Sequence, residues 1–325
     1  MERSKAQIVL AFTAGALLTL GFKDLYPHLR RWLQTPKQER HTQDAESALK
    51  LPYFSPHAPS TLPSSNAIHA APLLNEVGTT RVAKLSEEYV VKYGPQVDPI
   101  EGENMMFVKR YAAVPVPDVY AIYFDSERNC TYIIMEYIHG ETLASAWTSL
   151  DDTKKDRIAA ILRTYMKDLR ALPAPGYFGT LARRPLLESM FWTGQDTPSI
   201  SGPFDSEAQL NDGMIQKYLL FGGPAPKAAF YRRTLPHVFC GHQPVFTHAD
   251  FQRKNIIIHT DSEGKMAVTL IDWEKSGWLP SYWEFGMAMS AYHFQDDWDK
   301  WIGLILEPFH NEYLHLRMIH LDIWS

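Results

Sequence analysis

The stretch HADFQRKN, from His248 to Asn255, together with LIDWE further along, constrains the fold of this chain more than any other feature. Asp250 stands two residues after His248, and Asn255 stands five residues after Asp250. Between Asn255 and Asp272 lie two apolar runs joined by Asp-Ser-Glu-Gly, which predicts a β-hairpin. Because a hairpin brings its two ends together, we expect Asn255 and Asp272 to lie side by side.

The residue types at these positions suit phosphoryl transfer to an alcohol. That reaction needs a carboxylate that orients the hydroxyl and accepts its proton, and it needs oxygen ligands for Mg²⁺. Asp250 suits the first role, and Asn255 and Asp272 suit the second, because Mg²⁺ prefers hard oxygen donors. We include His248 among the catalytic residues, and we expect it to support the loop rather than to accept protons. The spacing H-x-D-x-x-x-x-N is that of the kinase catalytic loop; the alternative is a loop with this spacing by coincidence.

A lysine and a glutamate upstream fit the same chemistry. Lys92 ends the strand-like run YVVK, where its ammonium group could reach nucleotide phosphates, although most strand-end lysines are simply solvated. Glu101 lies early on the next predicted helix, where its carboxylate could hold Lys92. Glu103 is the competing choice, about 200° further round the helix. For both acids the alternative is a favourable position at a helix N-terminus.

Several other functions have no support. The sequence contains no P-loop, no G-x-G-x-x-G, no G-x-S-x-G and no H-E-x-x-H motif. The net charge is −5, and Lys and Arg do not cluster outside the N-terminus, so nucleic acid is not an expected partner. The two cysteines, Cys130 and Cys240, imply no disulfide framework.

The N-terminal segment, residues 1–34, contains an apolar run without charges at residues 6–22. This run is at the short end of what spans a bilayer. We expect an uncleaved membrane anchor with the catalytic part in the cytosol, because positive residues are more frequent after the run than before it. The alternatives are a cleaved signal peptide and a buried or interfacial helix. A chain whose segment does not insert would be soluble and cytoplasmic.

The rest of the chain divides by composition and periodicity. Residues 35–72 are rich in Pro and Ser and predict a linker. Residues 73–138 show the order strand, strand, helix, strand, strand, and residues 139–325 are mostly helical around the predicted hairpin. The individual strands are expected at 80–86, 88–94, 119–124 and 131–138, and helices at 98–112, 151–172 and 212–222.

Taken in order, these motifs resemble the aminoglycoside phosphotransferase and choline kinase-like family, the phosphotransferase enzyme family, and especially its fungal members of unassigned substrate. The resemblance runs from about Leu73 to Phe285. Its landmarks are VVKYG, EGENMMFV, VPVPDVY, IIMEYIHGETL, GYFGT, HADFQRKN and LIDWEKSGWLPSYWEF. The tripeptide His-Ala-Asp replaces the family's commoner His-Gly-Asp, and alanine restricts the backbone more than glycine does.

The resemblance implies an α+β, two-lobed, protein kinase-like fold. The N-lobe (73–138) would be small and β-rich and would bind nucleotide. The C-lobe (139–325) would be larger and mostly helical, with a catalytic β-hairpin. By this resemblance, Lys92 would contact the nucleotide phosphates and Glu101 would pair with Lys92. Glu136 and Ile138 would contact adenine through backbone groups. Asp250 would be the catalytic residue, and Asn255 and Asp272 would bind Mg²⁺.

We therefore predict an ATP- and Mg²⁺-dependent phosphotransferase that acts on a small-molecule hydroxyl. One alternative is a protein kinase, against which the missing G-x-G-x-x-G, Asp-Phe-Gly and Ala-Pro-Glu landmarks argue. The other is a catalytically silent pseudokinase scaffold, although the residues that such proteins lose are present. The sequence names neither the acceptor nor an oligomeric state. The segment MSAYHFQDDWDKW, residues 289–301, is either an acidic, aromatic wall for the acceptor or an ordinary helix.

Overall fold

The structure is a computed structural model that describes residues 48–58, 61–195, 197–261 and 263–324. The predicted anchor at residues 6–22 lies outside these residues and stays a prediction from the sequence. Within the described part of the chain, none of the helices is both long and apolar enough to cross a bilayer.

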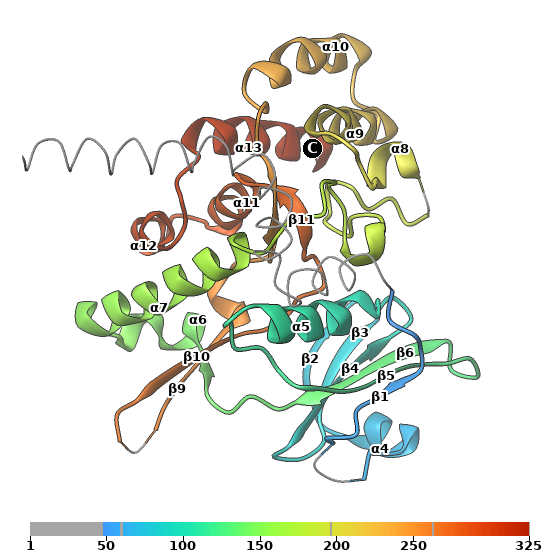
Figure 1. Cartoon of the computed structure of the whole chain (residues 1–325), viewed down its shortest axis with the longest axis vertical. Coiled ribbons are helices and arrows are strands. Elements are labelled where there is room, and N and C mark those ends of the chain that lie inside the picture. Colours follow the sequence, from blue (N-terminus) through green and yellow to red (C-terminus); the bar gives the residue numbers. More distant parts are fainter. Residues whose placement is uncertain (1–47, 59–60, 196, 262, 325) are drawn as a thin grey trace, which may run out of the picture. The chain divides into compact units, whose positions relative to one another are not determined.

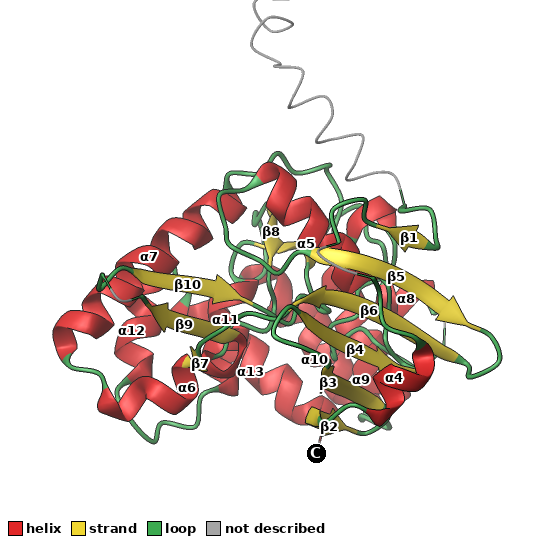
Figure 2. Ribbon diagram, turned by 90° about the horizontal axis from the view of Figure 1, so that it is seen from below, coloured by secondary structure: helices red, strands yellow, loops and turns green. Residues whose placement is uncertain are grey.

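The N-terminal part of the described chain is an antiparallel sheet of six strands in the order β1-β5-β6-β4-β3-β2 (Figures 1 and 2). Its central strands are rich in β-branched and aromatic residues, which fit a pleated, buried surface. The strands are β1 (Tyr53–Phe54), β2 (Leu73–Val77), β3 (Thr80–Lys84), β4 (Tyr89–Gly94), β5 (Val119–Asp125) and β6 (Cys130–Glu136), and the accompanying helices are α4 (Ser65–Ala70) and α5 (Ile100–Tyr111).

The two helices cover opposite faces of the sheet (Figure 1). Side chains alternate between the faces of a strand. Val91 and Tyr93 of β4 therefore pack in the cluster that contains Ile68 of α4. Val90 packs in the cluster that contains the apolar residues of α5. By the same alternation, Lys92 points to the side of α5.

Two short elements lie in the stretch 35–72, where the sequence indicated a linker without helical or strand period. Strand β1 pairs with β5 at the edge of the sheet, and α4 packs on the sheet through Ile68. A strand of two residues and a helix of six are too short to show a period, and both depend on contacts with distant parts of the chain.

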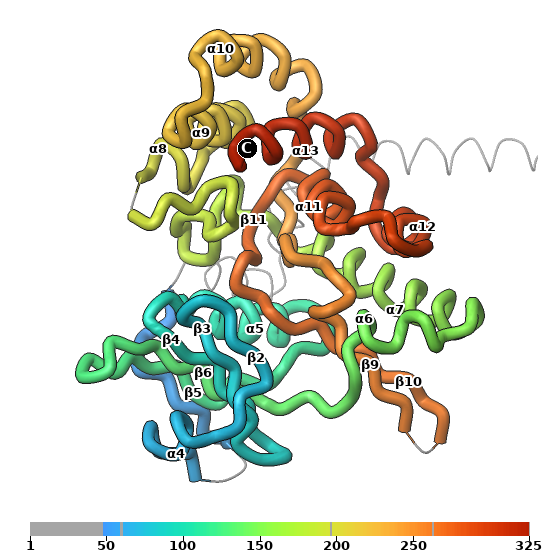
Figure 3. Tube along the Cα trace, turned by 180° about the vertical axis from the view of Figure 1, so that it is seen from behind, coloured from blue at the N-terminus to red at the C-terminus, as the bar shows by residue number. Residues whose placement is uncertain are grey.

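The C-terminal part is mostly helical and contains two small sheets (Figures 1 and 3). Helix α7 is amphipathic, and Asp151 caps it by accepting a hydrogen bond from the Lys154 N–H. The helices are α6 (Leu143–Ala146), α7 (Asp152–Arg170), α8 (Pro198–Ser201), α9 (Glu207–Leu220), α10 (Ala225–Thr234), α11 (Trp283–Ala291), α12 (Trp298–Ile305) and α13 (His310–Trp324). The strands are β7 (Glu141–Thr142), β8 (Pro244–Thr247), β9 (Ile256–Thr260), β10 (Met266–Leu270) and β11 (Gly277–Pro280).

These small sheets position the motifs singled out in the sequence. Strands β9 and β10 form the predicted hairpin, with Leu270 opposite Ile256. Strand β8 pairs with β11, with Thr247 opposite Gly277. The loop 248–255 leaves β8, and the segment 272–276 enters β11. Because β8 and β11 are paired, these two connections run beside each other.

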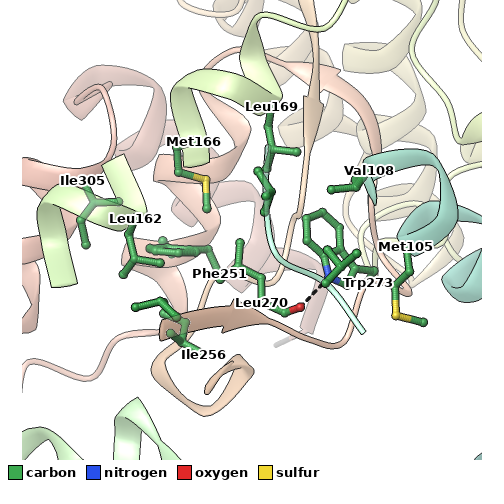
Figure 4. Packing of buried hydrophobic residues seen from close by; sticks show 14 of the residues in the cluster. Met105, Val108, Leu162, Met166, Leu169, Phe251, Ile256, Leu270, Trp273 and Ile305 are labelled. Atoms are coloured by element: carbon green, nitrogen blue, oxygen red, sulfur yellow. Dashed lines mark hydrogen bonds between the residues drawn. The ribbon is translucent and has the colours of Figure 1, made fainter. Parts of the chain in front are cut away.

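Apolar side chains on both connections anchor them in the core (Figure 4). Phe251 of the loop and Trp273 of the second segment are both almost fully buried. The indole Nε1–H of Trp273 donates a hydrogen bond of 2.9 Å to the Leu270 carbonyl oxygen. Close packing leaves such residues little freedom, so the polar residues next to them are held in place. Other members of this cluster are Met105, Val108, Leu162, Met166, Leu169, Ile256 and Ile305.

Candidate active site

Asp250 is the centre of a buried polar network in the 248–255 loop. Its side chain is only 9% exposed. The carboxylate accepts hydrogen bonds from Gln252 Nε2 at 2.6 Å and from Asn255 Nδ2 at 2.8 Å. Two ammonium groups also lie close, Lys275 Nζ at 3.4 Å and Lys254 Nζ at 3.6 Å. The carboxylate is thus fixed in direction by two amides and flanked by two cations.

The two cations decide the charge of Asp250. Burial by itself would raise the pKa of this carboxyl group, because a charged form loses hydration in the interior. Lys275 and Lys254 outweigh that effect, and they hold the pKa of Asp250 below its ordinary value. At neutral pH the group is a carboxylate and can accept a hydrogen bond from a hydroxyl group.

His248 supports the loop from behind. Its Nε2 lies 3.0 Å from the Ile271 carbonyl oxygen, its Nδ1 accepts a hydrogen bond from the Asp250 N–H at 3.2 Å, and its ring packs against Trp273. These contacts tie the loop to the segment that follows β10. His248 therefore orients Asp250 through the backbone and joins the two connections.

Ala249 adopts a backbone conformation that favours glycine. Its φ is 64°, in the left-handed region, where a residue with a Cβ is strained by roughly 1–2 kcal/mol. The buried carboxylate of Glu284 accepts hydrogen bonds from the N–H groups of His248 at 2.7 Å and Ala249 at 3.1 Å. These two bonds to a charged group offset the strain, so alanine is accommodated where the family commonly has glycine.

Lys92 lies in a group of three carboxylates. Its Nζ is 2.7 Å from Glu101 Oε2, 2.8 Å from Asp272 Oδ1 and 2.8 Å from Glu274 Oε2. Of the two acids considered for this contact, Glu101 is the one that pairs with Lys92. Glu103 instead forms an ion pair with Arg184, with 2.7 Å between Oε2 and Nη2.

The approach of α5 to the sheet makes the Lys92–Glu101 contact feasible. Gly102 has no side chain there, and a Cβ at this position would lie 2.4 Å from Ile122 Cδ1. Two residues further on, the buried Nδ2 of Asn104 donates a hydrogen bond of 2.9 Å to the Trp273 carbonyl oxygen. Helix α5 is thus bound on one side to the sheet and on the other to the segment that carries Asp272.

The charges in this group do not balance. Burial disfavours the ammonium form of Lys92, but Glu101, Asp272 and Glu274 outweigh it and raise the pKa of the lysine. Burial raises the pKa of Glu101, and the neighbouring carboxylates of Asp272 and Glu274 raise it further, whereas Lys92 lowers it. Three carboxylates thus face one ammonium group, and the oxygens of Glu101, Asp272 and Glu274 lie within 4.8 Å of one another. Such a set attracts a further cation.

The backbone brings the two predicted metal ligands to the open end of the hairpin. The Ile271 N–H donates a hydrogen bond of 3.0 Å to the Asn255 carbonyl oxygen, one residue before Asp272. Asp272 has a φ of 66°, which turns the chain away from β10. Since Nδ2 of Asn255 is bonded to Asp250, its Oδ1 is the atom that could bind a cation. The donors available, a carboxylate and an amide oxygen, fit Mg²⁺.

The two predicted hinge residues lie at the end of β6, Glu136 as its last residue and Ile138 two positions further on. The Glu136 N–H donates to the Asp118 carbonyl oxygen at 2.8 Å, and its carboxylate accepts from the Asp118 N–H at 3.1 Å. Between the two residues, the Tyr137 N–H donates to the Glu88 carbonyl oxygen at 3.0 Å. The segment up to Ile138 is thus tied to neighbouring strands, and its contact with adenine stays a prediction.

Sequence reasoning missed four residues that the structure brings to this site, namely Gln252, Glu274, Lys275 and Glu284. All four lie inside the quoted motifs, and the first three stand two or three residues after a predicted residue, so proximity along the chain was their available signal. Glu284 lies 34 positions after Asp250 in a helix, and no local pattern connects it with the loop.

We predict that Lys275→Met raises the pKa of Asp250. The lysine is the cation with the largest lowering effect on this carboxyl group, so its removal leaves burial opposed mainly by Lys254. The measurement is a carboxyl ¹³C NMR titration of Asp250 in the two proteins. Lys265→Met, at the exposed turn of the hairpin, is the control and should leave the titration unchanged. An unchanged or lower pKa in Lys275→Met would contradict the assignment.

Comparisons with known proteins bear on the family and the fold of the chain. The family model described as "Phosphotransferase enzyme family" matches residues 77–318. The chain is similar to the crystal structure of aminoglycoside phosphotransferase APH(4)-Ia, with 17% identity, a TM-score of 0.52, and coverage of 80% of this chain and 88% of that chain. It is also similar to the structure of the GDP and kanamycin complex of APH(2")-IIia, with 14% identity, a TM-score of 0.50, and coverage of 78% and 82%. No curated protein matches the chain. The structural likeness confirms the predicted two-lobed, protein kinase-like fold.

Proposed function

The chain belongs to the phosphotransferase enzyme family, and from this premise we propose that it transfers the γ-phosphate of ATP to a hydroxyl group of a small molecule. The observation that carries the proposal is the buried Asp250 carboxylate, oriented by Gln252 and Asn255. It lies on the same pair of connections as the Asp272 carboxylate, which contacts Lys92. A group that can orient an alcohol and a group that can bind phosphates are thus neighbours.

Asp250 would act on the acceptor. Its carboxylate accepts a hydrogen bond from the acceptor hydroxyl and holds that oxygen in line with the γ-phosphorus. As the new O–P bond forms, the bond between the γ-phosphorus and the β,γ-bridging oxygen breaks, ADP leaves, and the hydroxyl proton passes to Asp250. Because the pKa of Asp250 is below its ordinary value, the group stays a carboxylate before the reaction, so orientation is its main contribution.

Lys92 and the acidic residues would act on the nucleotide. Lys92 would donate hydrogen bonds to the α- and β-phosphates while Glu101 keeps its ammonium group in position. Asn255 and Asp272 would hold Mg²⁺, with Glu274 as a further candidate. When bound, the ion would neutralise charge on the phosphates. Glu136 and Ile138 would meet the adenine ring through backbone groups.

The chemical class of the phosphate acceptor follows less directly from these contacts than the reaction does. The similar solved structures carry names of aminoglycoside phosphotransferases, so aminoglycosides belong in any panel of acceptors. A catalytically silent scaffold is the alternative, but the residues whose loss would favour it, Lys92, Asp250 and Asn255, are all present and in contact with polar partners.

We predict that the protein binds MgATP and labels hydroxyl compounds from [γ-³²P]ATP, and that Lys92→Met weakens MgATP binding about tenfold or more. The loss corresponds to hydrogen bonds with charged groups, each worth about 1.5–3 kcal/mol. Binding is measured by the rise in the melting temperature with MgATP and by titration calorimetry. Lys109→Met, on the exposed face of α5, serves as the control.

Two outcomes would count against the proposal. If MgATP stabilised wild type and Lys92→Met equally, Lys92 would not contact the phosphates. If the protein bound MgATP but transferred phosphate to no hydroxyl compound, a binding scaffold would be the better description. The melting temperature of Lys92→Met without nucleotide is needed beside these data, because the substitution leaves the buried Glu101 without its partner.

A further inference from the structure

A small pocket opens beside the Asp250 carboxylate. Its volume is about 190 Å³. Gln252, Arg253 and Lys254 of the 248–255 loop form one wall, and Tyr292, His293 and Trp298, together with alanines of α6 and α11, form the others. An apolar cavity of about 150 Å³ holds benzene, so this pocket has room for a small molecule or for one end of a larger one.

Two of the lining residues connect the pocket with the reacting carboxylate, which is not itself part of the lining. Gln252 and Lys254 contact the two oxygens of Asp250, Oδ1 at 2.6 Å and Oδ2 at 3.6 Å. A molecule in the pocket is therefore separated from the carboxylate by these two side chains.

The residues that line the pocket are basic, although the segment 289–301 that supplies part of it is rich in acids. No aspartate or glutamate is among the lining residues, whereas Arg253, Lys254 and His293 are. The lining therefore offers hydrogen-bond donors on two sides, the loop and the end of α11, and positive charge from the loop.

Two of the three acids of that segment, Asp296 and Asp297, have other partners. Asp296 Oδ2 pairs with Arg253 Nη2 at 2.7 Å, and its Oδ1 accepts a hydrogen bond from the Trp298 N–H at 3.0 Å. Asp297 accepts hydrogen bonds from the indole groups of Trp147 and Trp301, both at 2.9 Å, and pairs with Lys155. The acidic wall considered from the sequence is thus used within the protein, and the side presented to the pocket is aromatic and basic.

We propose that the phosphate acceptor is a small alcohol that carries an anionic group, a carboxylate or a phosphate, and that this pocket binds the anionic group while a hydroxyl lies against Asp250. The inference rests on the proposed function and adds the acceptor class to it. A polycationic acceptor would meet Lys254 and Arg253 with like charge, which costs binding energy. An anionic one would gain a charge-assisted hydrogen bond from Lys254 and a further hydrogen bond from His293.

Three polyols of six carbons test the charge preference. Gluconate, glucitol and glucamine differ only in one end group, which is a carboxylate, a hydroxyl or an ammonium. Each of the other carbons carries a hydroxyl group, so the three compounds offer hydroxyls at several distances from that end group. Binding is measured by titration calorimetry on the full chain with Mg²⁺ and a non-hydrolysable ATP analogue. We expect gluconate to bind at least tenfold more tightly than glucamine, with glucitol between them. Phosphoglycolate, as a competitor of gluconate, tells whether a phosphate is accepted in place of the carboxylate.

Charge reversal in the pocket gives the matched test. Lys254→Glu should weaken gluconate binding at least tenfold and abolish the preference over glucamine, and His293→Glu should act in the same direction. The control is Lys154→Glu, because Lys154 is a surface lysine with 57% side-chain exposure, against 58% for Lys254, and also pairs with a nearby aspartate. Lys154→Glu should leave all three affinities unchanged.

Several results would overturn the proposal. These are equal binding of the three polyols, tighter binding of glucamine, no measurable binding of gluconate, or a loss in Lys254→Glu that affects MgATP and not gluconate. None of these results would affect the proposed phosphotransfer, which is measured separately by label transfer to aminoglycosides and other alcohols. Conversely, gluconate binding without any phosphate transfer would count against the proposed function and leave the anion pocket standing.

Discussion

Asp250→Asn is expected to fold, to bind MgATP about as well as the wild type, and to lose roughly 10²- to 10⁴-fold in kcat. The amide keeps the shape of the side chain but removes the charge that orients the acceptor hydroxyl and accepts its proton. It also replaces one acceptor oxygen by a donor, so either Gln252 or Asn255 loses its hydrogen bond. We expect a loss of about 1 kcal/mol of stability for that reason.

The measurement compares kcat, the MgATP dissociation constant and the melting temperature in Asp250→Asn and in wild type. Asp205→Asn is the matched control, since Asp205 pairs with Arg183 at the surface and has 67% side-chain exposure. Turnover of Asp250→Asn close to the wild-type value with an accepted alcohol would exclude the proposed role of Asp250. A large loss of MgATP affinity would instead place Asp250 at the nucleotide.

Asp272→Ala is expected to abolish measurable turnover, a loss of roughly 10³-fold or more, because the metal's stabilisation of the transition state is worth several kcal/mol. It should weaken nucleotide binding only when Mg²⁺ is present. In EDTA the affinity should be unchanged or slightly higher, because Lys92 loses one of its three carboxylate partners and is freer to meet phosphates. Titration of ATP with and without Mg²⁺ separates these effects.

Glu274→Ala distinguishes a metal ligand from an ion-pair partner. Glu274 and Asp272 both lie 2.8 Å from Lys92, so the two substitutions remove comparable contacts. If only Asp272→Ala shows the Mg²⁺-dependent loss, Asp272 is the ligand; if both do, Glu274 is a ligand as well. An equal loss of affinity in EDTA for Asp272→Ala would indicate a structural role and contradict the metal assignment.

The amino-acid sequence was enough to predict the helices and strands that have a local pattern of apolar residues, and it also contains the spacing of the site motifs. Short runs rich in β-branched and aromatic residues predicted β4 and β6, amphipathic spacing predicted α7, and two apolar runs around a turn predicted the β9–β10 hairpin. These patterns survive folding because they express periodicities of the backbone itself. The same holds for Asp250 and Asn255, which lie five residues apart on one short loop and are joined by a hydrogen bond.

Tertiary structure alone decided which charged groups meet. Glu101 and Glu103 stand two residues apart on one helix, yet only Glu101 contacts Lys92. Glu103 forms an ion pair with Arg184, which comes from a distant loop. Lys275 reaches Asp250 across 25 positions, and Asp296 pairs with Arg253 across 43. Such pairings depend on how packed elements bring side chains of both charges into contact, and no local period records them. For that reason Asp296 and Asp297, from a segment that is acidic in sequence, pair with Arg253 and Lys155 and do not line the pocket.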